Sequence, residues 1–142
     1  MKSARNLTAP CGIYCPNCEV YVENIADETV EFLAKHMPVD KMKVACKGCR
    51  VEKGSQMLFS SCAVVDCAAE KGVKFCFECD GFPCEKLQPV AESADKNPHN
   101  LKLYNLCRIK KVGVEKWAKE EAPEIRKKYF NGKFVPGCSP SI

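Results

Sequence analysis

The sequence lacks any long apolar run. No stretch approaches the roughly 18 apolar residues that a membrane-spanning helix needs, and residues 1–10 are without the apolar segment of a secretory signal. Charged residues make up 28% and hydrophobic residues 46% of the chain, which is a globular rather than a disordered composition. We therefore expect a soluble protein of the cytoplasm that makes no membrane contact.

The sequence also lacks the side-chain sets of familiar enzymes. It has no Ser/His/Asp or Cys/His set at a usable spacing, no glycine-rich phosphate loop and no internal repeat. Of its two histidines, His36 falls at the end of a predicted helix and His99 in a predicted loop. Either could replace a cysteine as a metal ligand, but we interpret both as surface or capping residues. The sequence therefore predicts no catalytic residues and no small-molecule substrate.

Cysteine, by contrast, is abundant. The chain has 12 cysteines in 142 residues, and ten of them lie between Cys11 and Cys84. Three Cys-x-x-Cys pairs stand out, namely Cys15 and Cys18, Cys46 and Cys49, and Cys76 and Cys79. This spacing places two thiolates on one tight turn, facing one tetrahedral ion, and Gly48 and Gly81 permit such turns. Because disulfides need an oxidising compartment, we favour metal over disulfides.

We predict two zinc ions, each held by four cysteines. Chain proximity and the pairing of Cys-x-x-Cys units group Cys15, Cys18, Cys46 and Cys49 at one site and Cys67, Cys76, Cys79 and Cys84 at the other. Cys11 and Cys62 are alternative ligands or neighbours of a ligand. Crossed pairings of the Cys-x-x-Cys units stay open, and we interpret Cys107 as a buried small hydrophobe.

Other cysteine chemistries stay open beside zinc. Cysteine ligands alone do not separate zinc from iron, so an iron–sulfur protein for electron transfer or sensing is the main alternative. Cys11-x3-Cys15-x2-Cys18 has the cysteine spacing of radical SAM enzymes, but the chain is too short for their barrel. Cys15-Pro16-Asn17-Cys18 also resembles a thiol–disulfide active site, yet no strand precedes it as that fold requires.

For the fold, we predict a mainly α single domain (small α+β) with irregular cysteine-rich loops, stapled by metal and followed by C-terminal helices. Residues 1–92 form the cysteine-rich part, 93–100 a linker loop, and 101–142 a helical segment packed on the first part. Residues 38–84 have few apolar periodic runs. A structural zinc contributes roughly 10–16 kcal/mol, against roughly 3–5 kcal/mol from a small core. We therefore expect that segment to be disordered without metal.

Apolar periodicity and end signals place the helices. In the cysteine-rich part we expect a helix with Asn24 as its N-cap, Pro38 at its end and Val30, Leu33, Ala34 and Met37 as its apolar stripe. A helix over 62–71 should end at Gly72, and residues 85–91 should add one or two turns. In the C-terminal part we expect a helix over 101–112, capped by Asn100, with Leu103, Leu106 and Cys107 on one face. A helix over 115–121, with Val114, Trp117 and Ala118 inward, should precede a last helix that starts near Pro123 and carries Ile125, Tyr129 and Phe130.

The C-terminal segment is basic. Residues 101–142 hold ten basic and four acidic side chains. Its clustered cations are Lys110, Lys111, Arg126, Lys127 and Lys128. Interspersed glutamates dilute the positive field, so a solvated helix surface is the simpler interpretation. A nucleic-acid-binding zinc module nevertheless stays a second alternative, beside an unknown protein partner.

The ordered cysteine motifs resemble a known family. They comprise Cys11-Gly12-Ile13-Tyr14-Cys15-Pro16-Asn17-Cys18, Cys46-Lys47-Gly48-Cys49, Cys62 to Cys67, Cys76-x-x-Cys79 and Phe82-Pro83-Cys84-Glu85-Lys86-Leu87. Together with the run from Asn105 to Trp117, they are similar to the domain-of-unknown-function family 3795, small bacterial and archaeal proteins regarded as zinc binders. The resemblance implies metal binding in a prokaryotic cytosol and no particular reaction. This chain departs from the family at Phe59, where members often have another cysteine, and at Cys138, where many have a full Cys-x-x-Cys pair.

Overall fold

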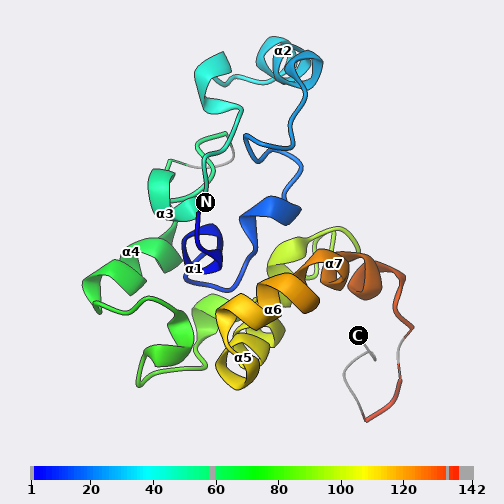
Figure 1. Cartoon of the computed structure of the whole chain (residues 1–142). Helices are drawn as coiled ribbons and strands as arrows, with labels where there is room; N and C mark the ends of the chain where they lie inside the picture. The colour runs from blue at the N-terminus through cyan, green and yellow to red at the C-terminus, as the bar shows by residue number, and fades with distance from the viewer. Residues whose placement is uncertain (1, 58–59, 134, 138–142) are drawn as a thin grey trace.

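The computed structural model describes residues 2–57, 60–133 and 135–137, which form helices joined by long loops (Figure 1). No β-strand is assigned in these ranges; the extended pairings are isolated bridges between Thr8 and Tyr14 and between Tyr21 and Cys46. The prediction of a mainly α chain with irregular cysteine-rich loops is therefore confirmed. Within the described ranges, no helix is both long enough and apolar enough to cross a membrane.

The helical elements follow one another along the whole chain. The α-helices are α1 (Ala4–Leu7), α2 (Asp27–His36), α3 (Cys49–Glu52), α4 (Ala63–Glu70), α5 (Lys102–Val112), α6 (Val114–Glu120) and α7 (Ala122–Asn131). The 3-10 turns are η1 (Cys15–Asn17), η2 (Lys41–Lys43), η3 (Cys76–Glu78), η4 (Glu85–Leu87) and η5 (Pro98–Leu101). We expected one or two helical turns over 85–91, and the structure has only the 3-10 turn η4 there. The turn η5 begins inside the predicted linker.

The core joins the first loop of the chain to the C-terminal helices. Trp117 of α6 is fully buried and meets the Tyr14 ring edge-on, with 5.8 Å between the ring centroids. Around Trp117, the hydrophobic cluster includes Ala9, Cys11, Phe75, Leu106, Ile109, Val114, Ala118 and Ala122. The predicted inward face of α6 is confirmed, whereas Phe130 is only half-buried. The cysteine loops therefore share a core with helices that lie about 100 residues later.

The helix α5 differs from its prediction in two respects. Asn100 does not cap it; its amide bonds with the backbone N–H and C=O of Val90, at 2.9 and 3.1 Å. Leu103 and Cys107 are exposed, and the buried residues are Asn105, Leu106 and Ile109. The interpretation of Cys107 as a buried hydrophobe is therefore wrong. The rotation of the helix is set by Asn105, whose Nδ2 donates to the Gly12 carbonyl at 2.9 Å.

Two helix ends in the cysteine-rich part contrast with each other. At the end of α4, Gly72 has a positive φ of 65°, and the N–H groups of Gly72 and Val73 donate to the carbonyls of Ala69 and Ala68. This Schellman arrangement confirms the predicted stop. At the start of α2, however, Ala26 occupies the N-cap position. The predicted cap, Asn24, instead donates from its amide to the carbonyls of Pro16 and Cys18 at 2.7 and 2.8 Å.

The helix α2 projects from the rest of the molecule. Figure 1 shows it at one extremity, far from α5, α6 and α7. None of its residues is buried, and its predicted apolar stripe is only half-buried. The stripe packs locally, because η2 is the element that α2 contacts most. The part of the chain around α2 thus depends on short-range contacts rather than on the shared core.

Candidate metal centres

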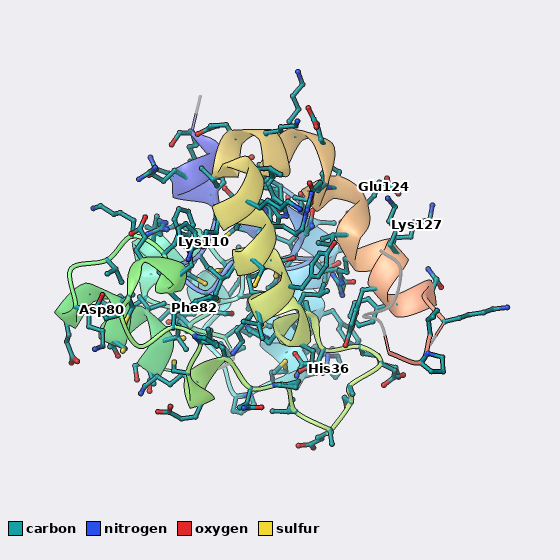
Figure 2. The ribbon with its side chains drawn as sticks, turned by 90° about the horizontal axis from the view of Figure 1, so that it is seen from below. His36, Asp80, Phe82, Lys110, Glu124 and Lys127 are labelled. Atoms are coloured by element: carbon teal, nitrogen blue, oxygen red, sulfur yellow. The ribbon has the colours of Figure 1, made fainter. Side chains whose placement is uncertain are left out.

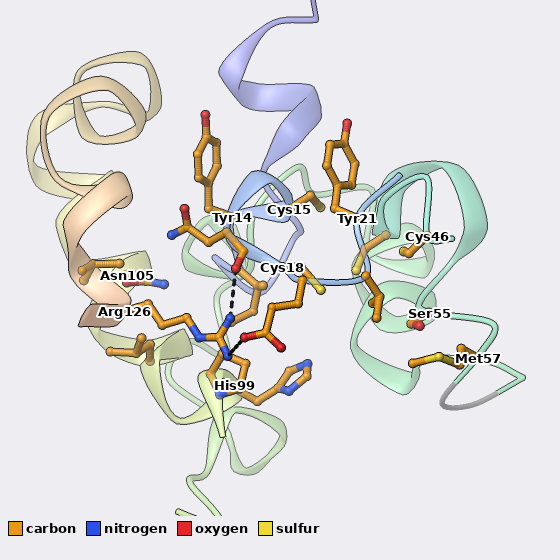
Figure 3. Close-up of a pocket in the computed structure, with 18 residues that line it drawn as sticks. Tyr14, Cys15, Cys18, Tyr21, Cys46, Ser55, Met57, His99, Asn105 and Arg126 are labelled. Carbon is orange, nitrogen blue, oxygen red and sulfur yellow. Dashed lines mark hydrogen bonds and ion pairs between the residues drawn. The ribbon is translucent and has the colours of Figure 1, made fainter. Parts of the chain in front are cut away.

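The first predicted group of cysteines lines one cavity. Cys15 and Cys18 flank the turn η1, and Cys46 and Cys49 flank the bend that leads into α3. All four line a cavity of about 200 Å³ (Figure 3). Two backbone hydrogen bonds of 2.8 Å bring the segments together, one from Val22 N–H to the Cys46 carbonyl and one from Cys46 N–H to the Val20 carbonyl.

The bend between Cys46 and Cys49 is a tight turn at Gly48. Gly48 has φ +103°, and its N–H donates to the Cys46 sulfur at 3.3 Å. A Cβ atom at this position would lie 3.4 Å from the Cys15 sulfur. That distance is an ordinary van der Waals contact, so glycine is favoured here by the positive φ and not by crowding.

Hydrogen bonding and burial set the protonation of these thiols. Cys49 donates a hydrogen bond to the Cys15 sulfur, which lowers the pKa of Cys15 to about 7. The same hydrogen bond, with burial, raises the pKa of Cys49. Burial raises the pKa of Cys46 to about 11. Without a cation Cys46 and Cys49 therefore keep their protons, and a bound divalent ion would reverse that preference.

The second predicted group also shares a cavity. Cys67 of α4, Cys76 and Cys79 around η3, and Cys84 before η4 line a space of about 310 Å³. Gly81 N–H donates to the Cys79 sulfur at 3.4 Å. Burial, and after it the charges of neighbouring thiolates, raise the pKa of Cys76 to about 12. This group thus repeats two features of the first one, the turn N–H on a sulfur and a disfavoured thiolate.

Cys11 and Cys62 line neither of the two cavities. Cys11 is only 7% exposed, and burial raises its pKa. A Cys11 thiolate is close enough to Cys49 and to Cys76 to raise the pKa of both, and Cys62 in turn raises the pKa of Cys11. The Cys76 N–H donates to the Pro10 carbonyl at 2.9 Å, so the loop that carries Cys11 runs beside the second group.

The sulfurs of each group are neighbours but are not gathered around one point. In the described part of the chain, no three or more His, Cys, Asp or Glu side chains form a cluster that could hold a metal ion. The cysteines there are free thiols. The donor set is nevertheless soft and of the right number for tetrahedral zinc. Binding would require the sulfurs to close in on the ion.

Arg50 is a structural residue that sequence reasoning missed. Its guanidinium donates to the carbonyls of Arg5 at 3.0 Å, Thr8 at 2.7 Å and Lys74 at 2.7 Å. It also lies over the Phe75 ring, 5.0 Å from the centroid. Arg50 thereby ties α3 to two other segments. The partners are main-chain carbonyls, which leave no signal in a sequence.

The two histidines differ. His36 is exposed, with Nδ1 2.7 Å from the Phe32 carbonyl and its ring stacked on Phe32, as a capping role predicts. His99 instead lines the first cavity, and burial lowers its pKa. His99 is thus half-buried at the wall of the cavity, and its surface or capping role stays a prediction. The predicted departures from the family at Phe59 and Cys138 lie outside the described residues.

The clustered cations of the C-terminal segment are divided between two helices, α5 and α7. Figure 2 shows Lys127 beside Glu124 on α7, well apart from Lys110 on α5. Arg126 is paired with Glu19, and Lys116 with Glu120.

A comparison with protein families finds a match that covers more than half of the chain. The family model described as "Protein of unknown function (DUF3795)" matches residues 7–89. This range holds all ten cysteines from Cys11 to Cys84 and both cavity-lining groups. Comparisons with curated proteins and with solved structures found no match.

Proposed function

Because the chain belongs to the DUF3795 family of proteins of unknown function, we propose its role from its own residues: it is a zinc-binding protein whose two four-cysteine sites stabilise a small interaction module. The first site would use Cys15, Cys18, Cys46 and Cys49, and the second Cys67, Cys76, Cys79 and Cys84. Zinc bound there would act as a structural cross-link. We propose no reaction.

One observation carries this proposal. Each of two separate cavities is lined by four cysteines that come from two segments of the chain. Four thiolates complete the coordination of a structural zinc, and such sites are closed to further ligands. Two backbone N–H groups support the proposal: Gly48 donates to the Cys46 sulfur and Gly81 to the Cys79 sulfur. Such hydrogen bonds stabilise a thiolate that ligates a metal.

Elemental analysis of protein purified without oxygen tests the metal. We expect close to two equivalents of zinc and a colourless solution. A brown protein that contains iron and acid-labile sulfide would instead establish the iron–sulfur alternative, because both metals accept four thiolates. A chain with neither metal, whose thiols all titrate freely, would end the proposal.

Paired substitutions test the grouping of the ligands. Cys15→Ser combined with Cys49→Ser should remove one equivalent of zinc and leave the second. Cys76→Ser combined with Cys79→Ser should remove the other equivalent. Cys107→Ser is the matched control, since Cys107 is exposed on α5 outside both cavities and should retain two equivalents. Loss of both equivalents from either pair would favour crossed sites or one shared cluster.

The interaction part of the proposal is supported by the projecting segment around α2. Phe32 of α2 is 59% exposed and Met42 of η2 is 86% exposed, and these two elements contact each other. We propose a protein partner in a prokaryotic cytoplasm, where reducing conditions keep zinc thiolates from forming disulfides.

A further inference from the structure

Arg126 brings a positive charge into the first cavity. Figure 3 shows its side chain reaching from α7 toward the region of Cys18 and His99. The guanidinium donates to the Asn17 carbonyl at 3.1 Å and lies over the Phe130 ring, 5.6 Å from the centroid. These two contacts fix its position, and only 29% of the side chain is exposed.

The acidic partner of Arg126 is easily replaced. One oxygen of the Glu19 carboxylate lies 3.2 Å from an Arg126 nitrogen, and the Glu19 side chain is 84% exposed. An ion pair with one partner so exposed to water adds little to stability. Arginine has a planar fork that binds carboxylates through two parallel hydrogen bonds. Glu19 therefore occupies a place that another carboxylate can take.

The rest of the cavity suits an apolar body. Its wall includes Ile13, Tyr14, Tyr21, Leu101 and Ile125. Its volume of about 200 Å³, which includes the space in front of the four cysteines, exceeds the roughly 150 Å³ that is enough to hold benzene in a protein interior. A single aromatic ring or a branched aliphatic chain therefore fits beside Arg126.

We propose that the first cavity binds a small carboxylic acid with an apolar body, about the size of benzoate, whose carboxylate displaces Glu19 from Arg126. This binding site goes beyond the proposed zinc sites, although cysteines of the first site form part of the wall. Four thiolates around one zinc ion leave a net negative charge, so the ligand carboxylate belongs at Arg126 and away from the sulfurs.

Benzoate is the probe, titrated into the full chain as purified and followed by amide NMR shifts. We expect saturable binding that shifts the amides of Tyr14, Leu101 and Ile125. Benzyl alcohol has the same ring without the charge, and we expect it to bind at least tenfold more weakly. The absence of saturable benzoate binding, or equal binding of the two probes, overturns the proposal.

Glu19→Gln gives the sharpest test, because it predicts a gain. Removal of the competing carboxylate should tighten benzoate binding at least threefold, which a poorly folded variant cannot do. Glu23→Gln is the matched control: it changes the net charge equally, but Glu23 pairs with Lys2. Equal affinities of the two variants overturn the proposal. Arg126→Gln should weaken binding at least tenfold.

The zinc content of each sample separates this proposal from the previous one. Benzoate binding by a chain that lacks zinc would end the zinc proposal and leave this one standing. Two equivalents of zinc without benzoate binding would do the opposite.

Discussion

Replacement of Gly12 by alanine tests how the cysteine loops are docked on the C-terminal helices. Gly12 has φ +87°, a conformation that side-chain-bearing residues rarely adopt. A Cβ atom there would lie 3.1 Å from Asn105 Cβ, 3.1 Å from Leu106 Cγ and 3.2 Å from the Lys102 carbonyl oxygen. Two of these atoms are main chain or next to it, so α5 itself would have to move.

Two costs add up in this variant. The left-handed backbone costs about 1–2 kcal/mol for an alanine. Crowding of a packed contact costs about 1–3 kcal/mol more. We therefore expect Gly12→Ala to lower the free energy of unfolding by about 2–5 kcal/mol. A small domain has only about 5–15 kcal/mol in total, so this is a large fraction.

Gly113→Ala separates the cost of the backbone conformation from the cost of crowding. Gly113 has φ +85°, almost the same as Gly12, and a Cβ atom there would meet nothing within 4 Å. Urea denaturation of zinc-loaded protein, followed by circular dichroism, should show Gly12→Ala to be less stable than Gly113→Ala by about 1–3 kcal/mol. Equal midpoints and slopes for the two variants would refute the docking contact between the loop at Gly12 and α5.

Three further predictions concern the metal, an ion pair and an arginine. Removal of zinc by a strong chelator should collapse the circular dichroism signal of the cysteine-rich part; an unchanged spectrum after verified removal contradicts its dependence on metal. Arg108 bonds both Glu121 carboxylate oxygens, at 2.6 and 2.8 Å, and this holds the pKa of Glu121 below its ordinary value of 4.5. Glu121→Gln should therefore be less stable than wild type at pH 7, and the difference in midpoint should vanish as the pH falls through the lowered pKa, because the carboxylate is then protonated; a difference that persists in acid points to packing instead. Arg50→Lys should cost about 1–3 kcal/mol in urea denaturation, because one ammonium cannot reach three carbonyls; wild-type stability would show that the fork is dispensable.

Local signals in the sequence predicted local structure well. Gly72 and Gly113 follow the ends of helices with a positive φ. Glycine adopts this conformation readily because it has no Cβ atom, so its position in the sequence is a local signal. The inward face of α6 follows from the spacing of Val114, Trp117 and Ala118, since period alone determines which residues share a face.

Contacts between distant segments account for the wrong predictions. The exposed Cys107 is apolar and lies in a helical pattern, but the rotation of α5 is decided by Asn105 and Gly12, which are 93 residues apart. Asn24 is a residue type that often caps helices. Its side-chain amide donates to the carbonyls of Pro16 and Cys18 instead. Arg126 gave no sign of a role in a cavity, because its place depends on how α7 packs.

For the candidate sites too, local spacing predicted one part of the arrangement and long-range contacts determine the other. Short-range spacing was enough to identify Cys46 with Cys49 and Cys76 with Cys79 as pairs. Which pairs face the same cavity depends on the backbone pairing of residues 20–22 with Cys46, which no local pattern encodes.

The edge-on contact between Trp117 and Tyr14 places the fluorescent indole ring next to the segment that carries Cys15. Trp117 is the single tryptophan, and Tyr14 directly precedes Cys15 in the chain. A shift of the Cys15 segment upon metal loading would change the surroundings of the indole ring, and with them its emission. Metal binding at the first proposed site would thus be followed by intrinsic fluorescence, in unlabelled protein and in real time.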